Sequence, residues 1–227
     1  MERSLLDLLV RHVKKRTPVA LVTWPASGNQ LLVCRGDDVA QDELTYAIDE
    51  GFRTDRSATI EISGEEVFIN IYNPPLRIII IGAVHIAQAL IPMARQACYD
   101  VFVVDPRTAF ASEERFAGVP RDMRWPDEAL NSMQLDARTA LVALTHDPKI
   151  DDMALQIALQ SNVFYVGALG SKRSHAKRVE RLAALGFNEA DIARVSGPIG
   201  LDIGAIGPVE IAISILAEVT AVLRGKL

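Results

Sequence analysis

The sequence is poor in the residues that build disulfide frameworks and zinc sites. Its 227 residues include only two cysteines, Cys34 and Cys98, and neither belongs to a CxxC pair. Two cysteines cannot staple a fold of this size. Four histidines occur without the HxxxH or HExxH spacing that is typical of zinc sites. No apolar run reaches the ~18 residues of a membrane span, and charges interrupt residues 1–16 too often for a secretory signal.

The chain also lacks an excess of basic charge. It carries 24 Lys and Arg against 29 Asp and Glu, a formal net charge of −5, which argues against a general nucleic-acid-binding protein. Hydrophobic residues make up 49% of the chain, enough for a sizeable core and too many for a disordered protein. We therefore expect a cytoplasmic protein with no nucleic-acid or membrane partner.

A proline pair divides the chain into two parts. Pro74-Pro75 resists both helix and sheet and directly precedes the apolar run LRIIII, so we predict domains at 1–75 and 76–227. The first reads as a small α+β domain whose second helix, at 39–51, is capped by Asp37 or Asp38. A core from about 75 residues is marginal alone, which predicts a homodimer. The other predicted elements are a helix at 5–15 and strands at 19–24, 30–34, 59–62 and 67–71.

The second part alternates between strands and helices. Such alternation predicts an α/β domain with a Rossmann-like parallel sheet, covered by helices on both faces. Pro208 suits the first turn of the final helix. The predicted strands are 76–81, 101–104, 123–125, 139–144 and 163–166, and the predicted helices are 84–97, 151–160, 171–185 and 208–223.

Ligands of such sheets bind beyond the carboxyl ends of the strands, and the first of these loops resembles a nucleotide-binding turn. The segment GAVHIA places Gly82 and Ala87 at the outer positions of a G-x-G-x-x-G/A fingerprint, but Val84 replaces the middle glycine. Asp105 follows the second strand at the position of a ribose-binding carboxylate, and Arg107 could hold a phosphate instead. NAD(P) binding is therefore left open and disfavoured by Val84.

The loop GALGSKR carries a second signal, for an anion site at the start of a helix. Gly167 and Gly170 allow unusual backbone angles, and Ser171 is a natural N-cap. Five basic residues against one acidic residue follow within 172–181, and we place Ser171 and Arg173 nearest the anion. The alternative is a solvated, charged helix face.

Two further loops contribute candidates. His146 and Asp147 follow the strand at 139–144 and suit proton transfer or hydrogen bonding to a ligand, unless they only cap the next turn. His85 lies where the first loop enters its helix, whereas His175 is expected at the surface. Asp202 is the one carboxylate of a glycine-rich loop, and we place it either at the pocket or in a structural turn.

Several strings together resemble the XdhC/CoxI family. They are THDPKIDDMALQIALQSNVFYVGALGSKRSHAKRVERL, then GPIGLDIGA, and a final helix that starts at Pro208. The segments 82–87 and 104–107 match as well, so that the resemblance covers roughly residues 76–225. Two motifs usual in the family's longer first domain, SAPRP-like and GGCVE, are absent. Cys34 lies in LLVCRGDD and inherits no role from them.

The resemblance implies an accessory factor for xanthine dehydrogenase and related molybdenum hydroxylases, with no turnover chemistry of its own. Such proteins bind the molybdenum cofactor, a pterin with a phosphate and a dithiolene-held metal, support its sulfuration by a sulfurase, and help to insert it into the apo-enzyme. Two alternatives remain: an NAD(P)-dependent oxidoreductase, and a nucleotide-sensing or scaffold module. The candidate cofactor-binding residues are Gly82, His85, Asp105, Arg107, His146, Asp147, Gly167, Gly170, Ser171, Arg173 and Asp202.

Overall fold

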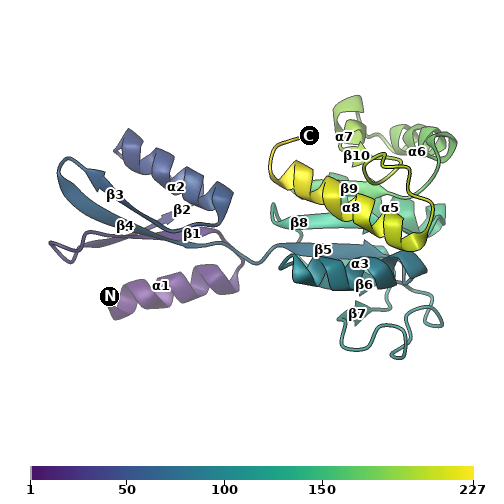
Figure 1. Cartoon of the computed structure of the whole chain (residues 1–227), viewed down its shortest axis with the longest axis horizontal. Helices are drawn as coiled ribbons and strands as arrows, with labels where there is room; N and C mark the ends of the chain where they lie inside the picture. Colours follow the sequence, from purple (N-terminus) through teal and green to yellow (C-terminus); the bar gives the residue numbers. More distant parts are fainter. Residues whose placement is uncertain (1) are drawn as a thin grey trace. The chain divides into compact units, whose positions relative to one another are not determined.

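The computed structural model describes residues 2–227 and divides into two compact units (Figure 1). The first ends at Pro74 and the second runs from Pro75 to Leu227. No helix among the described residues combines the length and the hydropathy needed to cross a bilayer. Each unit has its own hydrophobic core.

The N-terminal unit is a four-stranded antiparallel sheet with strand order β2-β1-β4-β3. Strands β3 and β4 form a hairpin through Ser63 and Gly64, whose φ angles of 53° and 81° are those of a type I′ turn. The strands that the sequence predicts at 59–62 and 67–71 are therefore confirmed, and this turn joins them. The elements are α1 (Arg3–Lys14), β1 (Val19–Thr23), β2 (Gln30–Cys34), α2 (Asp42–Thr54), β3 (Ala58–Ile62) and β4 (Glu65–Tyr72).

Helix α2 begins later than the sequence predicts. Its N-cap is Gln41, and no side chain caps it. The Asp37 carboxylate instead accepts a hydrogen bond from the Cys34 N–H at 2.7 Å, closing the turn after β2. The predicted cap at Asp37 or Asp38 was wrong because a short acidic side chain stabilises turns as readily as helix starts.

The C-terminal unit is built on a six-stranded, fully parallel sheet with strand order β10-β9-β8-β5-β6-β7. The Rossmann-like fold that the sequence predicts is confirmed. Its elements are β5 (Arg77–Ile81), α3 (His85–Gln96), β6 (Asp100–Val104), β7 (Arg121–Asp122), α4 (Pro126–Ser132), β8 (Thr139–Ala143), α5 (Pro148–Leu159), β9 (Tyr165–Ala168), α6 (Lys172–Ala184), α7 (Glu189–Ala193), β10 (Val195–Ser196) and α8 (Pro208–Leu223).

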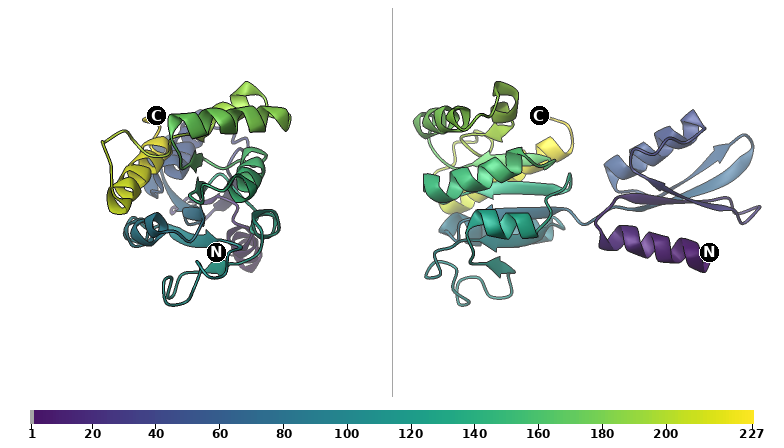
Figure 2. Two further views of the ribbon diagram at one scale, coloured as in Figure 1. Left: turned by 90° about the vertical axis from the view of Figure 1, so that its right-hand side faces the viewer. Right: turned by 180° about the vertical axis from the view of Figure 1, so that it is seen from behind.

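Both faces of this sheet are covered by helices (Figure 2). Ile78 and Ile80 of β5 pack on the face of α3 and α8, while Ile79 and Ile81 pack on the face of α4 to α7. Because successive side chains of a strand point to opposite faces, the continuous apolar run of β5 is what a doubly covered strand requires.

The sequence misses the shortest elements. Strand β7 has two residues and lies before the predicted 123–125, where α4 is about to begin. The helices α4 and α7 and the strand β10 were not predicted, since two to seven residues carry too little periodicity. The final helix starts at Pro208 and ends at Leu223 as expected.

Candidate functional site

The strand order reverses between β5 and β8. The chain adds β6 and β7 on one side of β5, and then β8, β9 and β10 on the other. In open α/β sheets the crevice at the carboxyl end of such a switch point is the usual place for a ligand. The loops that begin at Gly82 and Thr145 flank this point.

The Gly82 loop is held tightly against the β8 loop. The φ angle of Gly82 is 112°, and a Cβ atom there would lie 2.8 Å from Cγ2 of Thr145. Glycine is therefore required at this position, both for backbone conformation and for close approach. Val84 is the N-cap residue of α3, and the exposed His85 is its first residue.

Asp105 organises the β5 and β6 loops. Its side chain is 0% exposed, and it accepts hydrogen bonds from the Ala83 N–H at 2.8 Å and the Arg107 N–H at 3.0 Å. Arg107 Nε and Nη2 donate to the same carboxylate at 2.9 and 2.8 Å. Burial raises the pKa of Asp105, but these hydrogen bonds outweigh it and leave the pKa below its ordinary value.

These contacts weigh against a dinucleotide at this position. A ribose needs carboxylate oxygens free to accept its hydroxyl protons. Both oxygens of Asp105 are already occupied by protein donors, and Val84 stands where a pyrophosphate approaches the backbone. The structure thus adds a second objection to the NAD(P) alternative.

A second buried carboxylate, Asp151 of α5, shapes the β8 loop. It accepts from the Thr145 N–H at 3.2 Å, from Thr145 Oγ1 at 2.7 Å and from the His146 N–H at 3.0 Å. His146 is exposed and has a φ angle of 62°. Burial raises the pKa of Asp151 above its ordinary value despite these donors. Asp147 caps α5 by accepting from the Lys149 N–H at 3.0 Å.

A small hollow lies between α5 and α6, beside this loop; we call it the α5–α6 hollow. Its volume is about 200 Å³. Lining residues come from both helices and from the loops after β8 and β9, among them His146, Leu169 and Ser174. The basic lining residues are Lys177, Arg178 and Arg181, and the acidic ones are Asp151 and Asp152.

Arg178 is the most buried cation of the hollow, with 4% of its surface exposed. Its Nη2 donates to the Leu169 carbonyl at 2.9 Å, whereas Nε and Nη1 have no hydrogen-bond partner among the described residues. Burial lowers the pKa of Arg178, opposed by the charges of Asp151 and Asp152. The neighbouring Arg181 is engaged, because it forms an ion pair with Asp152.

The glycine-rich loop before α6 is only partly as expected. Ser171 caps α6 by accepting from the Ser174 N–H at 3.2 Å, as predicted. Gly170 has a φ angle of 149°, which favours glycine. Gly167 lies inside β9, where a Cβ would meet the side chain of Ile199 at 2.6 Å. Arg173 is exposed and does not line the α5–α6 hollow.

The glycine-rich loop around Asp202 is tied to helix α8. Glu218 of α8 accepts hydrogen bonds from the Gly200 N–H at 2.7 Å and from the hydroxyls of Ser196 and Tyr165. Asp202 itself is exposed and outside the lining of the α5–α6 hollow. These contacts give the loop a structural role as a connection between β10 and α8.

The sequence predicts His175 at the surface, but the structure shows it half-buried. Its ring packs against Gly197, where an added Cβ would overlap it, and its Nδ1 is buried without a partner among the described residues. Burial, followed by the charge of Arg178, lowers the pKa of His175. The prediction failed because the glycine loop that covers this face of α6 is distant in sequence.

Of the candidate residues taken from the sequence, only His146 lines the α5–α6 hollow. Asp151, Asp152 and Ser174 were passed over, and the lining residues Lys177, Arg178 and Arg181 were noted only as members of the basic run at 172–181. A signal for Arg178 was available, since it lies four residues before Leu182, which is 0% exposed, and therefore on the buried face of α6. For Asp151, the signal is a carboxylate in the first turn of a helix that already has an acidic cap.

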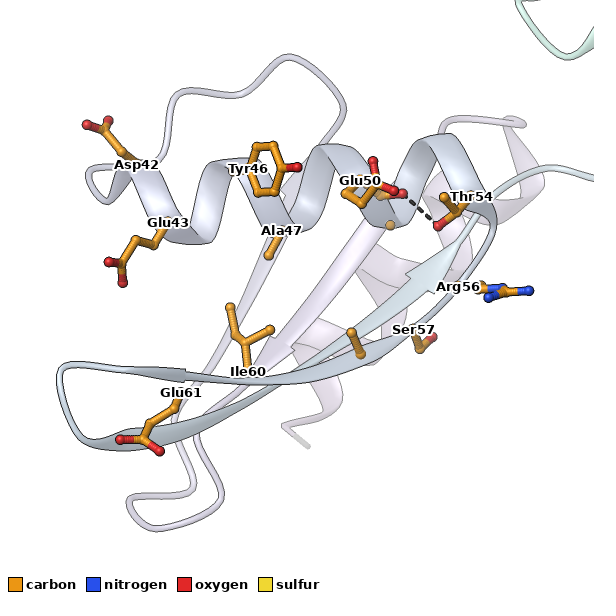
Figure 3. A pocket seen from close by; sticks show the side chains of 12 residues that line it. Asp42, Glu43, Tyr46, Ala47, Glu50, Thr54, Arg56, Ser57, Ile60 and Glu61 are labelled. Atoms are coloured by element: carbon orange, nitrogen blue, oxygen red, sulfur yellow. Dashed lines mark hydrogen bonds between the residues drawn. The ribbon is translucent and has the colours of Figure 1, made fainter. Parts of the chain in front are cut away.

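The N-terminal unit has a hollow of a different kind. An open groove of about 860 Å³ runs between α2 and β3, with the side chains of Ala47 and Ile60 facing each other across it and Tyr46 nearby (Figure 3). Carboxylates on its rim include Glu43 and Glu61. Nowhere in residues 2–227 do three His, Cys, Asp or Glu side chains gather as a metal site.

The fold and this edge define a class of protein: a Rossmann-type domain whose carboxyl edge departs from the dinucleotide-binding fingerprint at Val84 and Asp105. A family model described as the XdhC Rossmann domain matches residues 78–219, more than half of the chain. The chain belongs to this XdhC family.

Two relatives agree with this assignment. The chain is 31% identical over 151 residues to the molybdenum cofactor insertion chaperone PaoD of Escherichia coli (strain K12), covering 66% of this chain and 41% of PaoD. It is 30% identical over 154 residues to a probable xanthine dehydrogenase subunit of Bacillus subtilis (strain 168), covering 67% and 44%. The chain thus spans less than half the length of these relatives.

A solved structure shares the fold over nearly the whole chain. A protein from Bacillus halodurans, described as a xanthine dehydrogenase, superposes with a TM-score of 0.68 at 24% identity. The superposition covers 99% of this chain and 68% of that one. At this level of identity, the likeness concerns the fold alone.

Proposed function

We propose that this protein is a maturation factor that binds the molybdenum cofactor and passes it to the apo-form of a molybdenum hydroxylase of the xanthine dehydrogenase type. The observation that carries the proposal is the carboxyl edge of the XdhC-family domain. There protein contacts fill the dinucleotide position, while nearby two nitrogens of the buried Arg178 have no hydrogen-bond partner in the described part of the chain. The name of the relative PaoD supports the identity of the cargo.

The residues present suit an anionic cargo. The cofactor carries a phosphate, and the unpartnered Nε and Nη1 of Arg178 are donors that match phosphate oxygens. Arg107 and His146, at the neighbouring loops, are further candidates to contact the cargo outside the hollow. When bound, the cargo brings its own metal, and the chain's part is to hold and release it without turnover chemistry.

The proposal also includes a cytoplasmic location, a sulfurase partner and a homodimer. Support for the homodimer comes from α1, where Leu6, Val10 and Val13 are each at least 43% exposed and lie on one helix face. Sedimentation equilibrium of the purified chain tests the proposed homodimer. A single species of monomer mass at micromolar concentration would contradict it.

The test of function is transfer of the cargo. The purified chain is mixed with isolated molybdenum cofactor, gel-filtered, and added to the apo-hydroxylase. We expect cofactor to co-elute with the chain and to raise the recovery of hydroxylase activity above that with free cofactor. No co-elution and no gain in activity would contradict the proposal, and binding of NAD(H) or NADP(H) in calorimetry would favour the oxidoreductase instead.

A further inference from the structure

We propose that the α5–α6 hollow is a phosphate-binding site in which Arg178 and Lys177 contact the phosphate group of the ligand. That this phosphate belongs to the molybdenum cofactor rests on the proposed function. The anion chemistry of the hollow rests on its own contacts, and phosphate binding and cofactor binding can be measured separately.

Arg178 has N–H donors without an acceptor among the described residues. A guanidinium has five N–H donors and a permanent charge, but within residues 2–227 only Nη2 of Arg178 has an acceptor, the Leu169 carbonyl. Burying a cation without enough acceptors is unfavourable, so such a group in a native fold calls for a partner. A planar fork of N–H donors matches two oxygens of a phosphate.

The carboxylates of the hollow do not supply these acceptors. Asp152 is held by Arg181, and the Asp151 oxygens accept from Thr145 and His146. Their charges reduce the electrostatic penalty of burying Arg178, but neither forms a hydrogen bond with it. The three lining cations still exceed the two lining carboxylates by one charge.

Two helix starts meet at the same hollow. Pro148 opens the 12-residue helix α5, and Ser174 belongs to the first turn of the 13-residue helix α6. The amino-terminal end of a helix carries partial positive charge and attracts anions. These two ends add to the electrostatic field of the buried guanidinium. The guanidinium, with its unfilled donors, is the independent feature that marks the hollow as a binding site.

The size of the hollow sets the size of the group that enters. Its volume of about 200 Å³ is below the roughly 300–1,000 Å³ of drug-sized ligand pockets. It suits a single phosphate group whose parent molecule extends outside. Because Nε and Nη1 of Arg178 are closed off from solvent, a lining side chain must shift on binding. Lys177 is exposed, and no hydrogen bond or ion pair holds it among the described residues.

The direct test uses inorganic phosphate and the full chain. Binding is measured by isothermal titration calorimetry in wild type, Lys177→Ala and Arg178→Met, with Arg173→Ala as the matched control from the same helix outside the hollow. We expect equal affinities for wild type and Arg173→Ala, a loss of about tenfold or more in Lys177→Ala, and no measurable binding in Arg178→Met.

Two results would overturn the inference: no phosphate binding beyond that of chloride at equal ionic strength, or Lys177→Ala and Arg178→Met binding phosphate as well as Arg173→Ala does. If Arg178→Met fails to fold, Lys177→Ala decides alone.

Retention of isolated cofactor by the same variants separates the phosphate site from the proposed function. If wild type binds phosphate through Lys177 but retains no cofactor, the phosphate site stands and the proposed function fails. If all variants retain cofactor equally, the function stands and the hollow is not its phosphate site.

Discussion

The two halves of the carboxyl edge differ in how well their buried polar groups are satisfied. On the β5 and β6 side, the Asp105 carboxylate accepts four hydrogen bonds from Ala83 and Arg107. On the β8 and β9 side, two nitrogens of Arg178 have no partner among the described residues. A saturated cluster stabilises loops, whereas an unsatisfied one is suited to a ligand. The contrast moves the expected binding site away from the nucleotide-like loop.

The largest effect is expected at Asp105. Replacing it by alanine leaves the buried Ala83 N–H without its acceptor and the partly exposed Arg107 guanidinium without its ion-pair partner. An unsatisfied buried donor costs about 1–3 kcal/mol and a lost hydrogen bond to a charged group about 1.5–3 kcal/mol, so we expect a loss of about 3–5 kcal/mol, measured by chemical denaturation of the full chain. The control is Asp202→Ala, which removes an exposed carboxylate and should change stability by no more than ~0.5 kcal/mol. Equal effects of the two variants would contradict the scaffolding role of Asp105.

The next largest effect is expected at Gly82. Alanine there must adopt a φ angle of 112° and places a Cβ 2.8 Å from the Thr145 side chain. Backbone strain and overpacking together predict a loss of about 2–3 kcal/mol. Gly186→Ala has a more closely matched φ angle of 93° but meets no atom within 4 Å, so it separates strain from crowding. If both variants lose the same stability in denaturation, the close approach of the two loops is not what requires glycine.

A much smaller effect on stability is expected at Arg178. Methionine there removes one hydrogen bond to Leu169, but it also removes the penalty of burying a charge with unfilled donors. Because a buried ionic group is often replaced by an apolar one with little change, we expect the free energy of unfolding to change by no more than about 1 kcal/mol. A loss as large as that of Asp105→Ala would show that Arg178 is scaffolding too.

The two buried carboxylates should respond to pH in opposite directions. The pKa of Asp105 is lowered in the fold, so its stabilising contribution is present above the ordinary carboxyl value of ~3.9 and is lost as pH falls towards the folded value. The pKa of Asp151 is raised, so its ionisation disfavours the fold increasingly as pH rises through the same ordinary value towards the folded one. Carbon-13 NMR titration of the aspartate side chains measures both pKa values. If both pKa values were displaced in the same direction from the ordinary carboxyl value, the comparison would be contradicted.

Much of the fold could be predicted from the sequence because its signals are local. The isoleucine run of β5, the serine cap at Ser171 and the proline start at Pro208 each depend on a few neighbouring residues. The elements that were missed, such as β7 and β10, have two residues each and form only by pairing with a neighbouring strand.

The α5–α6 hollow was less predictable. Its decisive property is that two nitrogens of Arg178 have no hydrogen-bond partner among the described residues. Nothing in the string SKRSHAKRVER distinguishes the exposed Arg173 from the buried Arg178, except the register with Leu182. Likewise, the sequence places Asp105 where a ribose would bind, but that its oxygens are filled by Ala83 and Arg107 follows only from the fold.

Binding of an anionic ligand on the β8 and β9 side of the edge is the central expectation. Its most direct test is the phosphate-induced rise in melting temperature of two variants, Lys177→Ala in the α5–α6 hollow and Arg107→Ala beside Asp105, compared with wild type at equal ionic strength. The account predicts that Arg107→Ala keeps the rise and Lys177→Ala loses most of it. A rise that persists in Lys177→Ala and disappears in Arg107→Ala would contradict the account.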